Sequence, residues 1–153
     1  MSELRGVLES FTYGFPVVTV KDEMTSFMGT LATSFHTLED DSIQVVCSLG
    51  RYIGNFPAYQ RSNFFGVNLL SAKQASLAQH FNDRPVEIFE GVDCEMGISN
   101  TPMLRGCAIR LECRTKYFYE SGGEFVFIGQ LLQCDCSGLP YLRTSKSCPV
   151  SES

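Results

Sequence analysis

Two short polar segments hold the residues best suited to chemistry. The first, GTLATSFHTL at 29–38, sets Ala32, Thr33 and Ser34 in a row where a buried strand would normally carry Val or Ile. Small side chains let a flat ring or a phosphate approach backbone N–H groups closely, and the two hydroxyls add further donors. A polar strand end that binds nothing would fit the same residues, so the pattern alone leaves both interpretations open.

The second segment, CSLGRYIGN at 47–55, has a related arrangement. A strand ends in Ser48 and Gly50, Arg51 follows, and Asn55 is placed to cap a helix. The N-terminus of a helix beside an Arg is a favourable place for an anion such as a phosphate. Taken alone, this segment is also compatible with a strand end followed by an ordinary turn.

The familiar catalytic motifs are absent from the sequence. It contains no nucleophile elbow G-x-S-x-G, no phosphate loop G-x-x-x-x-G-K, no H-E-x-x-H and no G-x-G-x-x-G. The two histidines, His36 and His80, are expected at the rim of a barrel and within a helix, which argues against acid–base hydrolysis. With so little acid–base apparatus, we expect a bound cofactor to supply the chemistry.

The cysteines point to free thiols. There are seven, an odd number, and no C-x-x-C occurs; the nearest approach to a metal motif is Cys134-Asp135-Cys136. Because only two histidines accompany them, we expect no structural zinc and assign no metal ligands. An odd set of cysteines in a cytoplasmic chain favours free thiols over a disulfide framework.

Composition limits the class of protein. A chain of 153 residues, 44% of them hydrophobic, suffices for one domain with a sizeable core, and we assign a single domain to residues 1–153. Charged residues make up 19%, below the roughly 25% usual for soluble domains, which suggests that another subunit covers part of the surface. The net charge of −5 argues against nucleic acid as a partner.

No apolar run is long enough for a membrane span, and charged residues at positions 3, 5 and 9 interrupt any secretion signal, so we expect a cytoplasmic protein.

The apolar pattern predicts mostly strands with a few short helices. Strands are expected at 15–20, 26–35, 42–49, 64–70, 107–114 and 124–134, and helices at 2–11, 56–61 and, opened by an S-x-x-Q capping box, 72–81. Between them, 82–104 is expected to be a long loop and YESGGE at 119–124 a Gly-rich hairpin. The strand at 124–134 is apolar on both faces, which places it centrally or under a subunit interface. Many short strands indicate a closed or nearly closed antiparallel barrel.

Several motifs, taken in order, resemble one family. YGFPVVTV is similar to the opening strand of the flavin reductase-like, FMN-binding split-barrel proteins, and GTLATSFHTL is similar to their G-x-T-A-S-S-F-x-S-V segment. FFGVNLL resembles F-x-V-N-x-L, TPMLRGCAIRLEC resembles P-L-L-x-x-A-x-x-x-L-E-C, and FVFIGQL resembles I-F-V-G-E-V. The resemblance runs from about residue 10 to residue 133, and the order of the motifs makes it specific.

The resemblance implies a six-stranded antiparallel Greek-key split barrel with short flanking helices, which forms a homodimer and holds FMN, or FAD, at the subunit edge. Residues 31–33 would line the isoalloxazine ring, Ser34 would face the ribityl-phosphate, and 48–50 would approach the ring from the next strand. Asn55, in place of the family's Ser, and Arg84 would meet the phosphate. The implied cofactor contacts are therefore Leu31, Ala32, Thr33, Ser34, Ser48, Leu49, Gly50, Asn55 and Arg84.

The chain departs from the family at one hairpin. Where reductases that use NADH commonly carry G-D-H, with the His near the nicotinamide, this chain has Gly122, Gly123 and Glu124. The Glu124 anion should repel dinucleotide phosphates and cannot stack on nicotinamide. Glu124 is thus the candidate catalytic position of an NAD(P)H:flavin oxidoreductase. An electron carrier with tightly bound FMN, reduced by a redox protein as in flavoredoxins, is the alternative, and a barrel that only binds flavin is a third reading.

Overall fold

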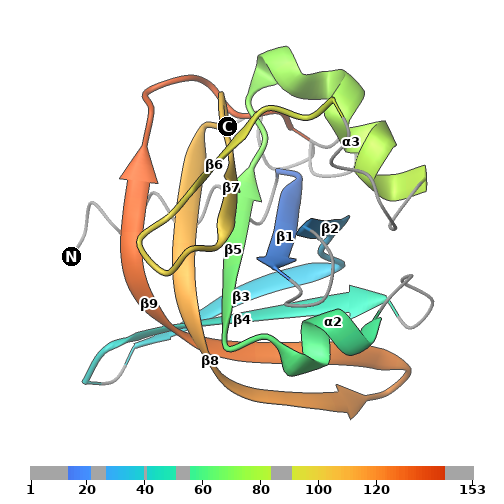
Figure 1. Cartoon of the computed structure of the whole chain (residues 1–153), viewed down its shortest axis with the longest axis vertical. Coiled ribbons are helices and arrows are strands. Elements are labelled where there is room, and N and C mark those ends of the chain that lie inside the picture. The colour runs from blue at the N-terminus through green and yellow to red at the C-terminus, as the bar shows by residue number, and fades with distance from the viewer. Residues whose placement is uncertain (1–13, 22–26, 40, 51–55, 84–90, 144–153) are drawn as a thin grey trace, which may run out of the picture.

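The computed structural model describes residues 14–21, 27–39, 41–50, 56–83 and 91–143, and it is mostly β, as expected (Figure 1). The elements, in chain order, are β1 (Pro16–Lys21), β2 (Phe27–Leu31), β3 (Ser34–Glu39), β4 (Ile43–Gly50), α2 (Phe56–Arg61), β5 (Phe64–Leu69), η1 (Ala72–Gln74), α3 (Ala75–Asp83), β6 (Cys94–Met96), β7 (Pro102–Leu104), β8 (Ile109–Ser121) and β9 (Glu124–Cys136). The helix expected at 2–11 lies outside the described residues.

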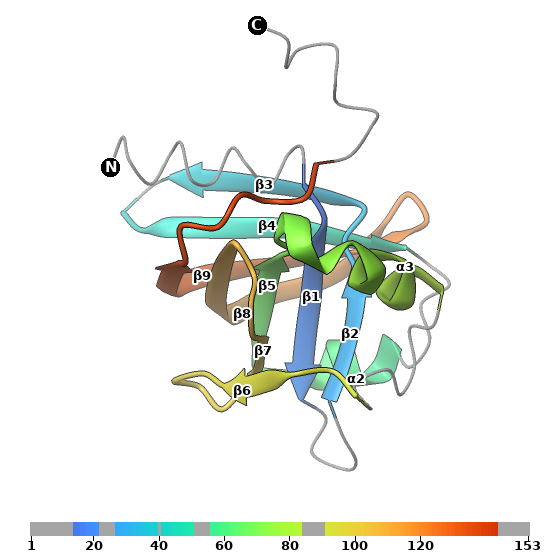
Figure 2. The same cartoon turned by 90° about the horizontal axis from the view of Figure 1, so that it is seen from above.

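Seven strands form one antiparallel sheet in the order β2-β1-β5-β8-β9-β4-β3. β2 and β3 lie at opposite ends of this order, although only Ala32 and Thr33 separate them along the chain. The sheet must therefore curl until its two edges approach each other, and the crossed layers of strands in Figures 1 and 2 show this curl. Because β2 and β3 are not hydrogen-bonded neighbours in the described sheet, the barrel is not closed.

The expectation of one strand over 26–35 is wrong, and this accounts for a sheet of seven strands rather than six. The Ala32 N–H donates to the Pro16 carbonyl on β1 (2.9 Å), whereas the next N–H, of Thr33, donates to the Ser48 carbonyl on β4 (2.7 Å). The chain changes partner strands between two consecutive residues, which ends β2 and starts β3. The Greek-key arrangement expected of the family is not confirmed.

A long hairpin of β8 and β9 spans the sheet. Each strand has 13 residues, and they are joined at Gly122 and Gly123, whose φ angles of 60° and 89° suit a two-residue hairpin turn. β8 continues to Ser121, well beyond the strand expected at 107–114. β9 lies between β8 and β4, which confirms the expectation that this doubly apolar strand is central.

Two apolar clusters hold the fold together. Inside the curled sheet, the Phe127 ring meets Tyr59, Phe65 and Phe118 edge-on, with ring centroids 5.9, 5.2 and 4.6 Å away. The second cluster packs α3 against the sheet through buried Phe81. The predicted helix at 72–81 is confirmed, and the Ser71 N–H donates to Gln74 Oε1 (2.9 Å) as in a capping box.

The long loop expected at 82–104 is only partly correct, since β6 and β7 pair as a small hairpin. The buried Glu112 carboxylate holds the turn between them, accepting the N–H of Ile98 (3.1 Å) and of Ser99 (2.6 Å) and the Ser99 hydroxyl. A Cβ at Gly97 would overlap this carboxylate, so the turn requires glycine there. Neither short strand carries an apolar alternation that would predict it.

The thiols are free where the structure describes them, as expected: six cysteines form no disulfide. Cys134 and Cys136 lie closest, with their sulfurs 4.0 Å apart. In the same part of the chain, no group of three or more His, Cys, Asp or Glu side chains is arranged to hold a metal ion. Among the helices described, none is both long and apolar enough to cross a bilayer.

Candidate functional site

The strand change at Ala32 and Thr33 brings the two polar segments together. Ser34 and Ser48 are direct partners across β3 and β4, and the Ser34 hydroxyl donates to Ser48 Oγ at 3.0 Å. The Thr33 hydroxyl donates to the Ser48 carbonyl at 3.2 Å, while the side chain itself remains exposed. These three hydroxyl residues and Gly50 form what we call the hydroxyl ledge, at the open end of the sheet.

Among the described residues, the backbone at Gly50 is lightly covered. A Cβ built there would meet Thr33 Cγ2, at 4.0 Å, and no other atom of this part of the chain, so a ligand can approach the backbone closely from this side. The Ser48 hydroxyl accepts from Ser34 and therefore keeps its own proton for a ligand. These features fit a flat ring with a phosphorylated tail, because they combine a lightly covered backbone with the hydroxyl donor of Ser48.

Glu124 lies beside the ledge. It is the first residue of β9 and the register partner of Gly50 on β4, in the half-buried region at the base of the Gly122–Gly123 turn. The pairing of β4 with β9 thus places a carboxylate next to the backbone that the sequence predicts will approach the cofactor. Sequence reasoning identified both residues from separate motifs, and the sheet brings them together.

Other predicted contacts are placed differently. The Leu49 side chain is fully buried in the core, so only its backbone faces the ledge. Leu31 and Ala32 are half-buried: Leu31 packs against the α3 cluster and Ala32 against the main core. The N–H groups of Ala32 and Thr33 donate to the carbonyls of Pro16 and Ser48, so these two backbone donors are already used within the sheet.

Two predicted phosphate contacts, Asn55 and Arg84, lie outside the described residues, as does Arg51. Asn68, the Asn of the motif FFGVNLL, is completely buried. Its amide donates to the Val17 carbonyl (3.0 Å) and to Thr19 Oγ1 (3.1 Å), and its carbonyl accepts the Leu104 N–H (2.9 Å). Asn68 therefore ties β5 to β1 and to β7 and has no group left for a ligand.

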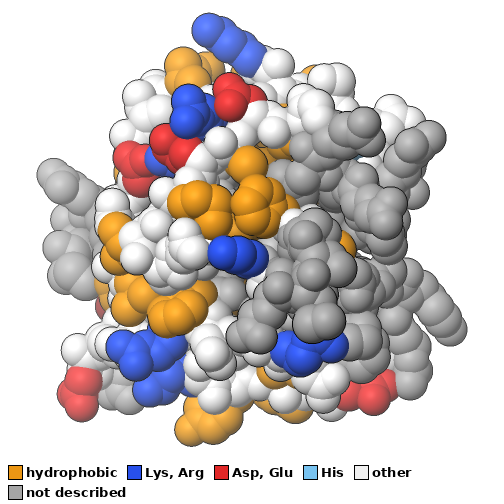
Figure 3. Space-filling model, in the orientation of Figure 1, with side chains coloured by type: hydrophobic (Ala, Val, Ile, Leu, Met, Phe, Trp, Pro, Cys, Tyr) orange, Lys and Arg blue, Asp and Glu red, His pale blue; other side chains and the backbone are white. Residues whose placement is uncertain are grey.

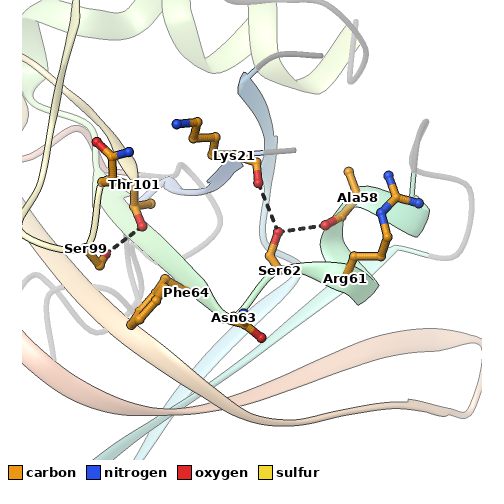
Figure 4. A pocket seen from close by; sticks show the side chains of 9 residues that line it. Lys21, Ala58, Arg61, Ser62, Asn63, Phe64, Ser99 and Thr101 are labelled. Atoms are coloured by element: carbon orange, nitrogen blue, oxygen red, sulfur yellow. Dashed lines mark hydrogen bonds between the residues drawn. The ribbon is translucent and has the colours of Figure 1, made fainter. Parts of the chain in front are cut away.

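Sequence reasoning missed a second concave region. A pocket of about 470 Å³ lies between α2, the end of β1 and the turn from β6 to β7, and none of the predicted cofactor contacts lines it (Figure 4). Its residues come from three separate segments, at 21, 58–64 and 99–101, and share no motif. The basic character of Lys21 and Arg61, two cations in a chain of net charge −5, is the only signal that sequence offers.

Comparison with known proteins identifies the class. The model of the "Flavin reductase like domain" matches residues 8–144, which is most of the chain. A curled antiparallel sheet, an open ledge of hydroxyl residues and this match together define a flavin-dependent oxidoreductase. The chain belongs to the flavin reductase-like family.

Individual relatives agree with this assignment. The chain is 31% identical over 135 residues to the NADH-dependent FAD reductase of Streptomyces globisporus, covering 85% of this chain and 73% of that protein. A solved structure of the NADH:FAD oxidoreductase SgcE6 from the same organism has a TM-score of 0.73 and 26% identity, covering 88% of this chain and 83% of the other. The chain is also 26% identical to HsaB of Rhodococcus jostii, the reductase subunit of a flavin-dependent monooxygenase. The aligned region is 83% of this chain and 65% of that subunit.

Proposed function

We propose that this protein is an NADH-dependent flavin reductase that binds FMN or FAD on the hydroxyl ledge and delivers reduced flavin to a monooxygenase partner. The observation that carries the proposal is the pairing of Ser34 with Ser48 beside the open backbone of Gly50, in a chain of this family. The names of the relatives support the donor and the partner, since one is NADH-dependent and another is the reductase subunit of a monooxygenase.

A flavin bound at the ledge would supply a ring that accepts hydride from nicotinamide and later releases two electrons. The chain's own residues would bind and orient it. Ser48 keeps a hydroxyl proton for the ribityl or phosphate oxygens, and Ser34 holds Ser48 in place. The exposed Thr33 side chain bounds the ledge and limits how a flat ring can lie. Positioning is the main contribution that direct hydride transfer requires of the protein.

Glu124 would select how the electron donor approaches. Because its carboxylate lies beside Gly50, it would repel the phosphates of a dinucleotide that crossed this side of the ledge. The same observation favours a second candidate function, an FMN electron carrier that a redox protein reduces, since a carrier needs no nicotinamide contact. The two functions differ in one measurement, the reduction of bound flavin by NADH.

Further parts of the proposal concern assembly and location. We include a homodimer and a single domain over 1–153, supported by the low share of charged residues and by exposed Leu38, Tyr117 and Tyr119 on strands β3 and β8. Light scattering should give twice the monomer mass, and a measured monomer mass would contradict the homodimer.

A cytoplasmic location is supported by the six free thiols that the structure describes. Fractionation of the source cells tests it.

The test of function is a visible spectrum after adding FMN or FAD and removing unbound flavin, recorded before and after anaerobic NADH. Flavin bands that bleach with NADH support the reductase. Bands that bleach only with a reduced redox protein support the carrier, and a colourless protein contradicts both. In matched titrations, the double substitution Thr33→Ala with Ser34→Ala should weaken flavin binding by about 1 kcal/mol, because it removes the Ser34 hydroxyl that holds the Ser48 donor in place. Thr37→Ala, farther along β3, is the control and should leave binding unchanged.

A further inference from the structure

The 470 Å³ pocket at the far end of β1 has the features of a second ligand site. Its walls are the last residue of β1 (Lys21), the end of α2 with the start of β5 (61–64), and the turn before β7 (99–101) (Figure 4). Its volume lies within the range of roughly 300–1,000 Å³ common for small-molecule sites. Lys21 and Pro16, whose carbonyl meets the hydroxyl ledge, are the two ends of a six-residue strand, so the two sites are roughly 16 Å apart.

The lining of the pocket is cationic and rich in donors. None of its nine residues is Asp or Glu, and the Lys21 ammonium pairs with none of the described carboxylates. The side-chain amides of Asn63 and Asn100 likewise have no hydrogen-bond partner within the described parts of the chain. In the view of Figure 3, one group of basic side-chain atoms lies at the lower right, where α2 lies in Figure 1, and others lie at the lower left, the centre and the top of this face. An anion is the ligand that such a lining favours.

The serine and threonine hydroxyls that line the pocket form hydrogen bonds within the protein, and these bonds fix the positions of the pocket walls. The Ser62 hydroxyl donates to the Ala58 carbonyl (2.7 Å), and the hydroxyls of Ser99 and Thr101 share a hydrogen bond of 2.7 Å. Figure 4 shows the first of these bonds holding Ser62 between α2 and Lys21. The wall is therefore formed before any ligand binds, which lowers the entropic cost of binding.

The turn that carries Asn100 is also fixed. The Asn100 N–H donates to the Gly97 carbonyl (3.0 Å), and the Gly97 N–H donates to the Thr101 carbonyl (2.8 Å). Asn100 has a φ of 65°, which asparagine tolerates better than other residues with a side chain. Glu112 holds the turn from behind through the N–H groups of Ile98 and Ser99. The donor amide of Asn100 is thus presented from a turn with little freedom.

One wall is aromatic. Phe64, the first residue of β5, is half-buried, and its ring contacts no other aromatic ring of the described residues. In Figure 4 the ring lies between Ser99 and Ser62, below the Lys21 side chain. A half-buried phenyl ring that lines a pocket beside a cation offers a place for a nucleobase to stack next to its phosphates.

We propose that this pocket binds a nucleoside diphosphate group, with the phosphates on Lys21 and Asn100 and the base against Phe64. The group can belong to a free nucleotide or to the adenosine half of a dinucleotide. This inference does not depend on flavin chemistry, and it assigns a role to the basic pocket lining at the end of β1.

The probe is adenosine diphosphate, titrated calorimetrically into the full-length protein saturated with flavin, so that the hydroxyl ledge is filled. We expect saturable binding of one equivalent. Lys21→Met should weaken it roughly ten- to hundredfold, as expected for loss of a charge-assisted contact. Phe64→Leu should weaken adenosine diphosphate but leave inorganic pyrophosphate unchanged. Lys116→Met, an exposed cation on β8 outside the pocket, is the matched control.

Absence of binding, or equal affinity in Lys21→Met and Lys116→Met, would overturn the proposal. Circular dichroism of each variant shows whether it is folded, and Lys21→Arg, which keeps the charge, should retain binding. If adenosine diphosphate competes with NADH during turnover, the group belongs to the dinucleotide; binding without competition assigns the pocket to a free nucleotide. A protein that lacks NADH-driven flavin reduction can still bind adenosine diphosphate, so failure of the proposed function is seen separately.

Discussion

The buried Glu112 carboxylate gives the sharpest quantitative prediction, through the substitution Glu112→Gln. Glu112 is 4% exposed, and its two carboxylate oxygens accept the Ile98 N–H at 3.1 Å, the Ser99 N–H at 2.6 Å and the Ser99 hydroxyl. Glutamine has nearly the same volume but only one side-chain oxygen, so it can accept from one side of the turn only. Its NH₂ group would then face an N–H donor of the other side.

The expected loss follows from these contacts. One backbone donor without an acceptor costs about 1–2 kcal/mol here, the lower part of the usual range, because the Ile98 N–H is only part-buried. Exchanging a charged for a neutral acceptor weakens each of the two remaining hydrogen bonds by about 1 kcal/mol. The free energy of unfolding should therefore fall by about 3–4 kcal/mol, a large share of the 5–15 kcal/mol typical of a domain.

The assay is urea denaturation followed by circular dichroism, since the chain has no Trp. The control is Asp41→Asn, which removes one negative charge from an exposed residue and should change stability by less than about 0.5 kcal/mol. Limited proteolysis should also cut the variant first at the turn between β6 and β7. Equal stability of the two variants would refute the view that Glu112 holds this turn.

Three further predictions test other parts of the structure. Burial raises the pKa of the Cys47 and Cys107 thiols from 9.0 to about 12. Above pH 9 these thiols lose their protons in the unfolded chain but keep them in the folded chain, so the free energy of unfolding should fall by about 2–3 kcal/mol per cysteine by pH 11. Urea titrations at pH 8 and pH 11 measure this fall, and an unchanged free energy of unfolding would contradict it. A Cβ at Gly129 would lie 2.5 Å from the Phe65 ring and 2.9 Å from the Arg114 carbonyl oxygen, so Gly129→Ala should lower the melting temperature markedly. An unchanged melting temperature would show that β8 and β9 can move apart enough to accept the methyl group. Glu124→His should raise the rate of NADH oxidation by removing the anion beside Gly50, compared with Glu120→His near the end of β8; equal rates would remove the hairpin from the mechanism.

Local patterns predicted much of this fold. The β-branched run at 16–20 is a strand, and the pair Gly122–Gly123 makes the turn between β8 and β9 because both residues adopt positive φ. The S-x-x-Q pattern at Ser71 and Gln74 opens the helix that it predicted. The order of the motifs indicated the family, which the match over 8–144 confirms. Each of these features depends on residues close together in the chain.

The sequence pattern did not predict the break between β2 and β3. Nothing in the run FMGTLATSF ends a strand, since it contains no proline and only one glycine, well before the break. The break exists because the carbonyls of Pro16 and Ser48, on two different strands, accept consecutive N–H groups. The same holds for β6 and β7, whose turn is held by Glu112, a residue 13 positions away from Ser99.

The sequence by itself determined the β class, the hairpin turn, the helix start and the residue types of the hydroxyl ledge, because backbone preferences and burial periodicity are local properties. Only the tertiary structure decided that Ser34 meets Ser48, that Glu124 lies beside Gly50 and that Lys21 faces the turn at 99–101. These neighbours come from strand pairing and sheet curvature. Both depend on which distant carbonyls and side chains are available once the chain has folded, and no short segment carries that information.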